Sequence, residues 1–141
     1  MDLTSPLQQL PHGPEFRFID RLLSLEPGIK GTAEFTPRGS EEYFRGHFPG
    51  EPLMPGVLLL EAAAQLAGVV AQCDPNQTPL NGLKLTAIRA AKILGTARPG
   101  ETVTVHAQIS GRMGHLIQAQ ATVTLRGTLL VQCDLTLAGT A

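Results

Sequence analysis

The segment from Gly56 to Gln72 constrains the fold more than any other part of this chain. Leu, Ala and Val fill most of its positions, and Leu and Ala favour helix. Pro55 directly before it suits the first turn of a helix, and Pro75 with Asn76 marks its end. Because the run is apolar on every face, we expect a helix that is buried almost all round.

The segments on either side of this run predict antiparallel strands joined by turns. Before the helix, two strands are expected around the turn signal Glu26-Pro27-Gly28. After the helix, the hydrophobic period changes to two, which is typical of half-buried antiparallel strands. The expected strands are 16–25, 29–35, 83–94, 103–110, 117–125 and 129–137.

These elements predict a single α+β domain over residues 1–141, with a curled antiparallel sheet of about six strands wrapped around one long central apolar helix. No linker, repeat or low-complexity segment divides the chain. A helix that is apolar all round also needs cover on its second side, and the sequence offers no further layer to supply it. A partner subunit is therefore expected.

Composition narrows the classes of function. Of the 141 residues, 43% are hydrophobic and 16% are charged, which indicates a compact globular domain. The net charge of -1 gives no basic field for nucleic acid. The apolar run is too short and too polar in its middle to span a membrane. Cys73 and Cys133 are expected to be reduced thiols, and the first residues do not resemble a signal peptide, so we expect a cytoplasmic protein.

Glu61 is the anomalous residue of the helical run. A carboxylate inside an apolar helix costs several kcal/mol unless it is paired, hydrogen-bonded or protonated. Such a carboxyl group suits general acid catalysis, and a structural glutamate that reaches the surface or bonds a buried backbone group fits equally well. Gln65 lies one turn further along the same face, so it is either a hydrogen-bond partner of Glu61 or a packing amide.

His47 stands in the loop 46–50, which feeds directly into the helix that carries Glu61. Histidine can take or give a proton near neutral pH, which makes His47 a candidate base, although an exposed loop histidine is the alternative. Gly56, in the first helical turn, presents an N–H at the positive end of the helix dipole. That group is a candidate donor to a developing enolate, or simply part of helix initiation after Pro55.

The remaining histidines are expected to be surface residues: His12, His106 and His115. No two histidines have metal-ligand spacing on a helix, so no metal site is predicted. The chain also lacks a glycine-rich phosphate loop and a Gly-x-Ser-x-Gly elbow.

The segment 46–58 reads Gly-His-Phe-Pro-Gly-Glu-Pro-Leu-Met-Pro-Gly-Val-Leu, and 60–65 reads Leu-Glu-Ala-Ala-Ala-Gln. This stretch closely resembles the active-site segment of 3-hydroxyacyl-(acyl carrier protein) dehydratases of fatty acid synthesis. Leu10-Pro11-His12, Ile19-Asp20-Arg21 and Pro99-Gly100-Glu101 resemble other parts of that family. The resemblance thus extends over nearly the whole chain.

The resemblance implies the hotdog fold and a homodimer whose sheets join edge to edge, with a trimer of dimers as a larger assembly. It implies dehydration of a (3R)-3-hydroxyacyl thioester of acyl carrier protein to the trans-2-enoyl thioester, without a cofactor. His47 of one subunit would take the α-proton, and Glu61 of the other would protonate the leaving hydroxyl. The Gly56 N–H would hold the thioester carbonyl, and the Leu53 carbonyl would accept a hydrogen bond from His47.

The resemblance also implies where the substrate lies and which branch of the family is involved. A glutamate at position 61 resembles the branch that dehydrates only, whereas the branch that also isomerises typically carries aspartate. Two segments, 13–16 and 93–96, depart from the family pattern where chain length and carrier docking would be decided. The acyl tail would run along the helix beside Phe48, Pro49, Val57, Leu60 and Gln65.

Two other functions remain open on the sequence, a hotdog acyl thioesterase and a non-catalytic acyl-binding hotdog subunit. The thioesterase needs a carboxylate on the same helix but not the histidine loop. Arg89, Lys92 and Arg98 are candidate contacts for an acidic carrier protein, or ordinary solvated charges.

Overall fold

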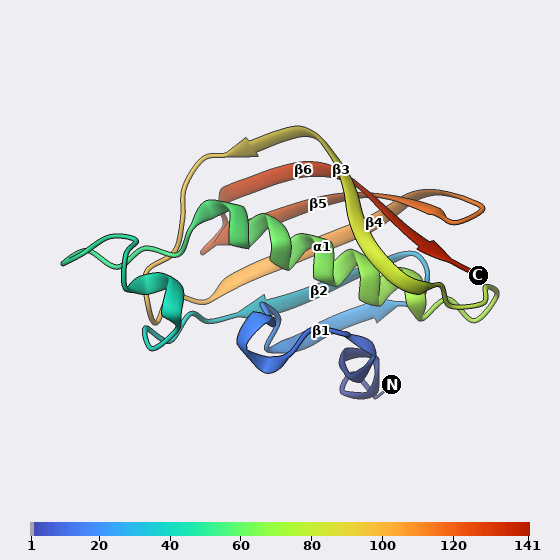
Figure 1. The fold of residues 1–141 in the computed structure, drawn as a ribbon, viewed down its shortest axis with the longest axis horizontal. Helices are drawn as coiled ribbons and strands as arrows, with labels where there is room; N and C mark the ends of the chain where they lie inside the picture. The colour runs from blue at the N-terminus through green and yellow to red at the C-terminus, as the bar shows by residue number, and fades with distance from the viewer. Residues whose placement is uncertain (1) are drawn as a thin grey trace.

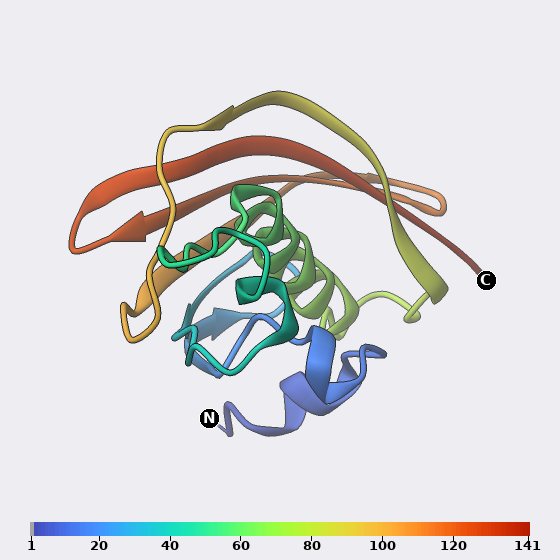
Figure 2. The same ribbon diagram turned by 60° about the vertical axis from the view of Figure 1, so that its left-hand side comes forward.

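A computed structural model describes residues 2–141; Met1, the first residue of the predicted domain, lies outside the described residues. The six strands form one antiparallel sheet in the order β1-β2-β4-β5-β6-β3. The sheet curls around α1 (Figures 1 and 2), which confirms the predicted α+β class and the hotdog fold. The elements are η1 (Ser5–Gln9), η2 (Pro14–Phe16), β1 (Arg21–Glu26), β2 (Lys30–Phe35), η3 (Glu42–Phe44), α1 (Gly56–Gln72), β3 (Asn81–Ile93), β4 (Val103–Met113), β5 (Leu116–Leu125) and β6 (Thr128–Thr140).

The helix bounds confirm the sequence prediction, whereas three predicted strand bounds were wrong by three residues or more, including the last strand, which ends at Thr140 and not at 137. Residues 16–20 do not belong to the first strand. The side-chain amide of Gln65 instead forms hydrogen bonds with the Phe16 carbonyl and the Phe18 N–H. The predicted end of the fourth strand at 110 is also wrong. β4 continues through Gly111 to Met113, which pairs with Leu116, and the chain turns at 114–115.

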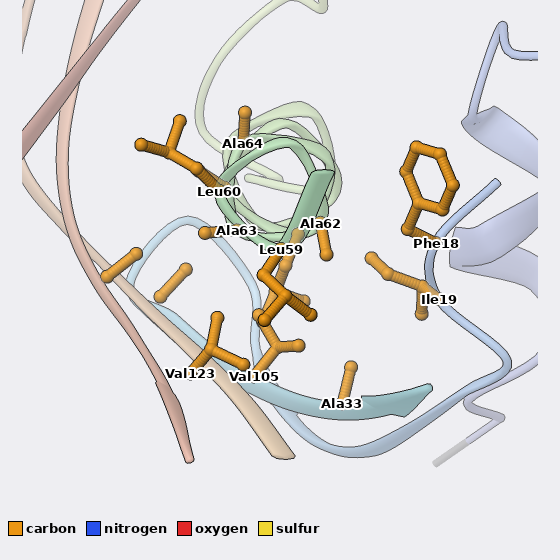
Figure 3. Close-up of a cluster of buried hydrophobic side chains, with 14 of the residues drawn as sticks. Phe18, Ile19, Ala33, Leu59, Leu60, Ala62, Ala63, Ala64, Val105 and Val123 are labelled. Carbon is orange, nitrogen blue, oxygen red and sulfur yellow. The ribbon is translucent and has the colours of Figure 1, made fainter. Parts of the chain in front are cut away.

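One face of α1 packs against the concave side of the sheet. Figure 3 shows Leu59 and Ala62 on the side of the helix that faces the sheet, near Ala33 and Val105. These side chains are wholly buried, and burying a leucine contributes about 1.5–3 kcal/mol. The inward positions of β4 and β5 alternate with polar outward positions, as the period of two predicts.

The second side of α1 is covered in part by the chain itself. The N-terminal segment crosses the helix on the side away from β3 (Figure 2), and Leu10 and Phe18 from this segment are buried in the core. The expectation that the chain has no further layer is therefore wrong, because the apolar side chains of the lead-in supply one. Val57 at the start of α1 stays 64% exposed, and the edge strand β3 is exposed over most of its length.

Within residues 2–141, none of the helices combines the length and the apolar character that crossing a membrane requires.

Candidate active site

The loop that carries His47 is closed by two hydrogen bonds to Leu53. Leu53 N donates to His47 O over 2.8 Å, and His47 Nδ1 lies 2.9 Å from Leu53 O. Because a carbonyl oxygen only accepts, Nδ1 must carry the proton of this bond. The neutral imidazole then presents the lone pair of Nε2, which is the arrangement of a proton acceptor.

This loop is also tied to the connection between β3 and β4. Met54 is fully buried, and its N–H donates to Ala97 O over 2.8 Å. The Thr96 hydroxyl donates to Met54 O. Arg98 and Glu51 form an exposed ion pair over 3.6 Å, which adds little stability. The backbone contacts of Met54 therefore hold the His47 loop against the connection between β3 and β4.

Glu61 is partly buried on α1 and is held by the side chain of Gln65. Gln65 Nε2 donates to Glu61 Oε2 over 3.1 Å and to Phe16 O over 2.8 Å, and Gln65 Oε1 accepts from Phe18 N over 2.9 Å. The backbone N–H of Phe18 fixes which end of the amide is oxygen. The contact between Gln65 and Glu61 that helical spacing predicts is present, with Gln65 as the donor.

His12 was expected to be a surface residue, and this expectation is wrong. Its side chain is partly buried, and its Nε2 lies 3.4 Å from Glu61 Oε2. The N-terminal lead-in crosses α1 and brings His12 beside the carboxylate. The signal that could have identified His12 was its place in Leu10-Pro11-His12, one of the segments that resemble the dehydratases.

A cavity of about 490 Å³ adjoins this carboxylate. Glu61, Gln65, Gly68 and Gln72 form one stripe of α1 along its wall. At a helical rise of ~1.5 Å per residue, about 16 Å of the helix axis separates Glu61 from Gln72. The other lining residues are Leu10, Pro11, His12, Phe16, Ala64, Val69, Pro79, Leu80, Asn81, Gly82, Leu83, Lys84, Leu85 and Leu137.

The end of the cavity near Gln72 is fixed by the backbone of the segment before β3. Gln72 Nε2 donates to Leu80 O over 2.7 Å, and Gln72 Oε1 accepts from Leu80 N over 3.0 Å. This two-way contact holds the segment 79–81 against the last turn of α1. The cavity therefore runs from the Glu61 carboxyl group at one end to the Gln72 side-chain amide at the other.

Of the predicted substrate contacts, Gln65 lines this cavity, and the other four do not line it within one chain. Phe48 and Pro49 line a separate cavity of about 420 Å³ beside Phe44. Val57 is exposed, and Leu60 is buried in the core. The predicted substrate contacts therefore do not line a single cavity within one chain.

Gly56 lies in the first turn of α1, and its N–H has no acceptor among residues 2–141. A Cβ at this position would come within 2.5 Å of Ile93 Cγ2. The side chain of Ile93, from β3, therefore takes the space that a glycine leaves open here.

His47 and Glu61 form no hydrogen bond or ion pair with one another in the part of the chain that the structure describes. His47 is absent from the lining of the cavity that holds Glu61. The imidazole of His47 and the carboxyl group of Glu61 are thus each held in place, but they do not line the same cavity of one chain.

A carboxyl group at a cavity and a tautomer-fixed imidazole, on a hotdog fold, define the class of acyl-thioester enzymes. Residues 10–134 match the FabA-like domain, and the chain belongs to this family. It is 36% identical over 131 residues to the 3-hydroxyacyl-[acyl-carrier-protein] dehydratase FabZ of Chloroflexus aggregans. The aligned region covers 93% of this chain and 90% of the relative. The dehydratase FabZ of Rickettsia africae is 33% identical over 136 residues, with 96% and 94% covered.

Solved structures share the fold at low sequence identity. The dehydratase heterocomplex ApeI:P from Xenorhabdus doucetiae superposes with a TM-score of 0.79 at 14% identity and covers 100% of this chain and 93% of its own. Zebra fish thioesterase superfamily member 2 gives a TM-score of 0.70 at 17% identity, with 96% and 91% covered. Since both dehydratases and thioesterases share this fold, the fold alone does not choose between the two reactions.

Proposed function

We propose that this protein dehydrates (3R)-3-hydroxyacyl thioesters of acyl carrier protein to trans-2-enoyl thioesters in fatty acid biosynthesis. The observation that carries the proposal is the His47 imidazole, held by the Leu53 carbonyl with Nε2 free, together with the Glu61 carboxyl group at the cavity wall. The dehydratases named above, aligned over nearly the whole chain, support the same reaction. The reaction is an elimination of water and needs no cofactor.

In this reaction, His47 Nε2 takes the α-proton of the thioester, and the Gly56 N–H stabilises the charge that builds on the thioester carbonyl. Glu61 gives its proton to the 3-hydroxyl group, which leaves as water as the double bond forms between C2 and C3. The Leu53 carbonyl keeps His47 in the tautomer that accepts at Nε2. Proton exchange with solvent resets both residues.

We infer that the working unit is a homodimer in which His47 of one subunit meets Glu61 of the other. The separation of the two groups within one chain supports this arrangement. β3 stands at the edge of the sheet with Ile88 and Ile93 each 47% exposed, and an uncovered edge strand pairs readily with a second copy. Phe48 and Val57, 50% and 64% exposed, then belong to the site shared with the partner, and a trimer of dimers is the larger assembly.

The carrier protein is expected to dock beside the exposed cations of β3. Arg89 and Lys92 are exposed on this strand, and Arg98 follows it. Acidic carrier surfaces are attracted to such groups, chiefly through the association rate. Two free cysteines agree with a cytoplasmic setting.

The experiment is an assay of the full-length protein with 3-hydroxybutyryl and crotonyl thioesters of acyl carrier protein. We expect interconversion of the two thioesters, followed by the enoyl absorbance, without release of free thiol. His47→Ala and Glu61→Gln should each lower the rate by roughly 10²–10⁴-fold, while the control His115→Ala, in the exposed turn after β4, should not. Release of free thiol would favour the thioesterase, and acyl binding without either reaction would favour a non-catalytic subunit.

A further inference from the structure

Two nitrogen atoms converge on the same oxygen of Glu61. Gln65 Nε2 lies 3.1 Å from Glu61 Oε2, and His12 Nε2 lies 3.4 Å from it. The Gln65 contact is a donated hydrogen bond, because the other end of the amide accepts from Phe18 N. Glu61 Oε2 therefore accepts a hydrogen bond from Gln65, whatever His12 contributes.

The surroundings of His12 decide which of its nitrogens carries the proton. His12 Nδ1 is buried and has no hydrogen-bond partner in the described part of the chain. A proton on Nδ1 would leave a buried donor unsatisfied, and the lone pair of Nε2 would face an oxygen that already accepts from Gln65. A proton on Nε2 leaves Nδ1 unpaired as an acceptor instead of a donor, but it removes the repulsion between the Nε2 lone pair and the carboxylate and points a donor at that oxygen. The favoured neutral tautomer is therefore Nε2–H, with Nε2 as a second donor toward Glu61 Oε2.

The segment that carries His12 is fixed from two sides. Arg17 Nε donates to His12 O over 2.8 Å, and Arg17 Nη2 donates to Leu10 O over 3.2 Å. The Phe16 ring stacks on the His12 ring with centroids 6.2 Å apart and planes inclined by 22°. Since Arg17 binds backbone carbonyls, it holds the position of His12 without competing for the imidazole. The ring is thus held beside the carboxylate by its own segment.

From these contacts we infer that His12 is a positioning residue for Glu61. Gln65 donates to Oε2, and His12 Nε2–H points at the same oxygen from 3.4 Å, so the proton that Glu61 gives to the substrate is held on Oε1. When Glu61 has delivered that proton it becomes a carboxylate, and both donors then stabilise the new charge. Such contacts are stronger in the transition state than in the ground state, so they raise kcat rather than substrate affinity. This inference rests on the proposed role of Glu61 as the acid.

The kinetic test compares two amides at position 12. His12→Gln places an amide nitrogen near the position of Nε2, whereas His12→Asn places one near Nδ1. We expect His12→Asn to lower kcat by roughly ten- to hundredfold at nearly unchanged KM, the size of one charge-assisted hydrogen bond. His12→Gln should stay within roughly threefold of wild type, because the donor is restored. In a Glu61→Gln background, His12→Asn should cause no further loss.

A second measurement does not depend on turnover. Nitrogen NMR of the full chain should show His12 in the Nε2–H tautomer, with nitrogen shifts that change in Glu61→Gln but not in the control Glu15→Gln. Equal losses in His12→Asn and His12→Gln, full additivity with Glu61→Gln, or an Nδ1–H tautomer would each overturn the inference. If the wild-type protein shows no dehydration but the NMR result holds, the proposed function fails while the contact between His12 and Glu61 stands.

Discussion

Gln65 joins α1 to the N-terminal segment, because one amide bonds the Glu61 carboxyl group, the Phe16 carbonyl and the Phe18 N–H. The side chain is 2% exposed, so water does not replace these bonds when the amide is lost. The same residue therefore stabilises the fold and orients the Glu61 carboxyl group.

Replacing Gln65 by leucine should affect both stability and activity. A buried N–H or carbonyl left without a partner costs about 1–3 kcal/mol. Gln65→Leu leaves the Phe18 N–H and the Phe16 carbonyl without their partners. We expect the free energy of unfolding, measured by urea titration, to fall by about 2–4 kcal/mol, and kcat to fall as Glu61 loses its orientation. Gln120→Leu on the exposed face of β5 is the control and should change stability by less than about 0.5 kcal/mol.

The shared site predicts complementation between two inactive variants. In a mixed dimer of His47→Ala and Glu61→Gln subunits, one of the two sites has both native residues. After unfolding, mixing and refolding in equal amounts, about a quarter of wild-type activity per subunit should return by statistical pairing. Refolding each variant alone is the control and should recover nothing. Activity of a dissociated wild-type monomer would contradict the shared site.

Gly68 should set the length of acyl chain that the cavity accepts. A Cβ at this position would meet Leu83 Cδ2 at 3.6 Å and Leu137 Cδ1 at 4.0 Å, both ordinary contacts. Gly68→Ala should therefore raise the free energy of unfolding by about 0.5–1 kcal/mol through helix propensity. Gly68→Leu should lower kcat/KM for long acyl chains and leave the four-carbon substrate nearly unaffected. An equal loss for every chain length would show that the acyl tail lies elsewhere.

Cys133 should resist alkylation in the folded protein. Burial, with a smaller contribution from Asp134, raises the pKa of its thiol from 9.0 to about 11. At pH 9, iodoacetamide should modify Cys133 far more slowly in the native protein than in guanidinium chloride, with half-buried Cys73 reacting first.

The same pKa shift gives Cys133 a defined contribution to the pH dependence of stability. Between pH 9 and about 11 the unfolded thiol has lost its proton and the folded thiol still holds it. The contribution is therefore fully present below pH 9 and declines as the pH rises through this window. Cys133→Ala should flatten that decline in urea titrations. If the free energy of unfolding of Cys133→Ala falls with pH as steeply as that of the wild type, other groups cause the decline.

The sequence by itself determined the elements whose cause is local. The bounds of α1 follow from a run of helix-favouring residues between Pro55 and Pro75, and the strands after it follow from a hydrophobic period of two. The contact between Gln65 and Glu61 follows from helix geometry, since residues four apart share a face. The residue pattern made Glu61 and His47 candidates, and the family resemblance assigned them the roles of acid and base, which stay predictions.

Only the tertiary structure decided where the distant segments meet. His12 lies beside Glu61 because the N-terminal lead-in crosses α1, and residues 16–20 leave the sheet because the Gln65 amide binds their backbone. The cavity follows the face of α1 that carries Glu61 and Gly68, and it does not include Val57, one turn earlier on the same face. Local periodicity carries no information about the path of a loop, because that path is set by packing and hydrogen bonds between residues far apart in the chain.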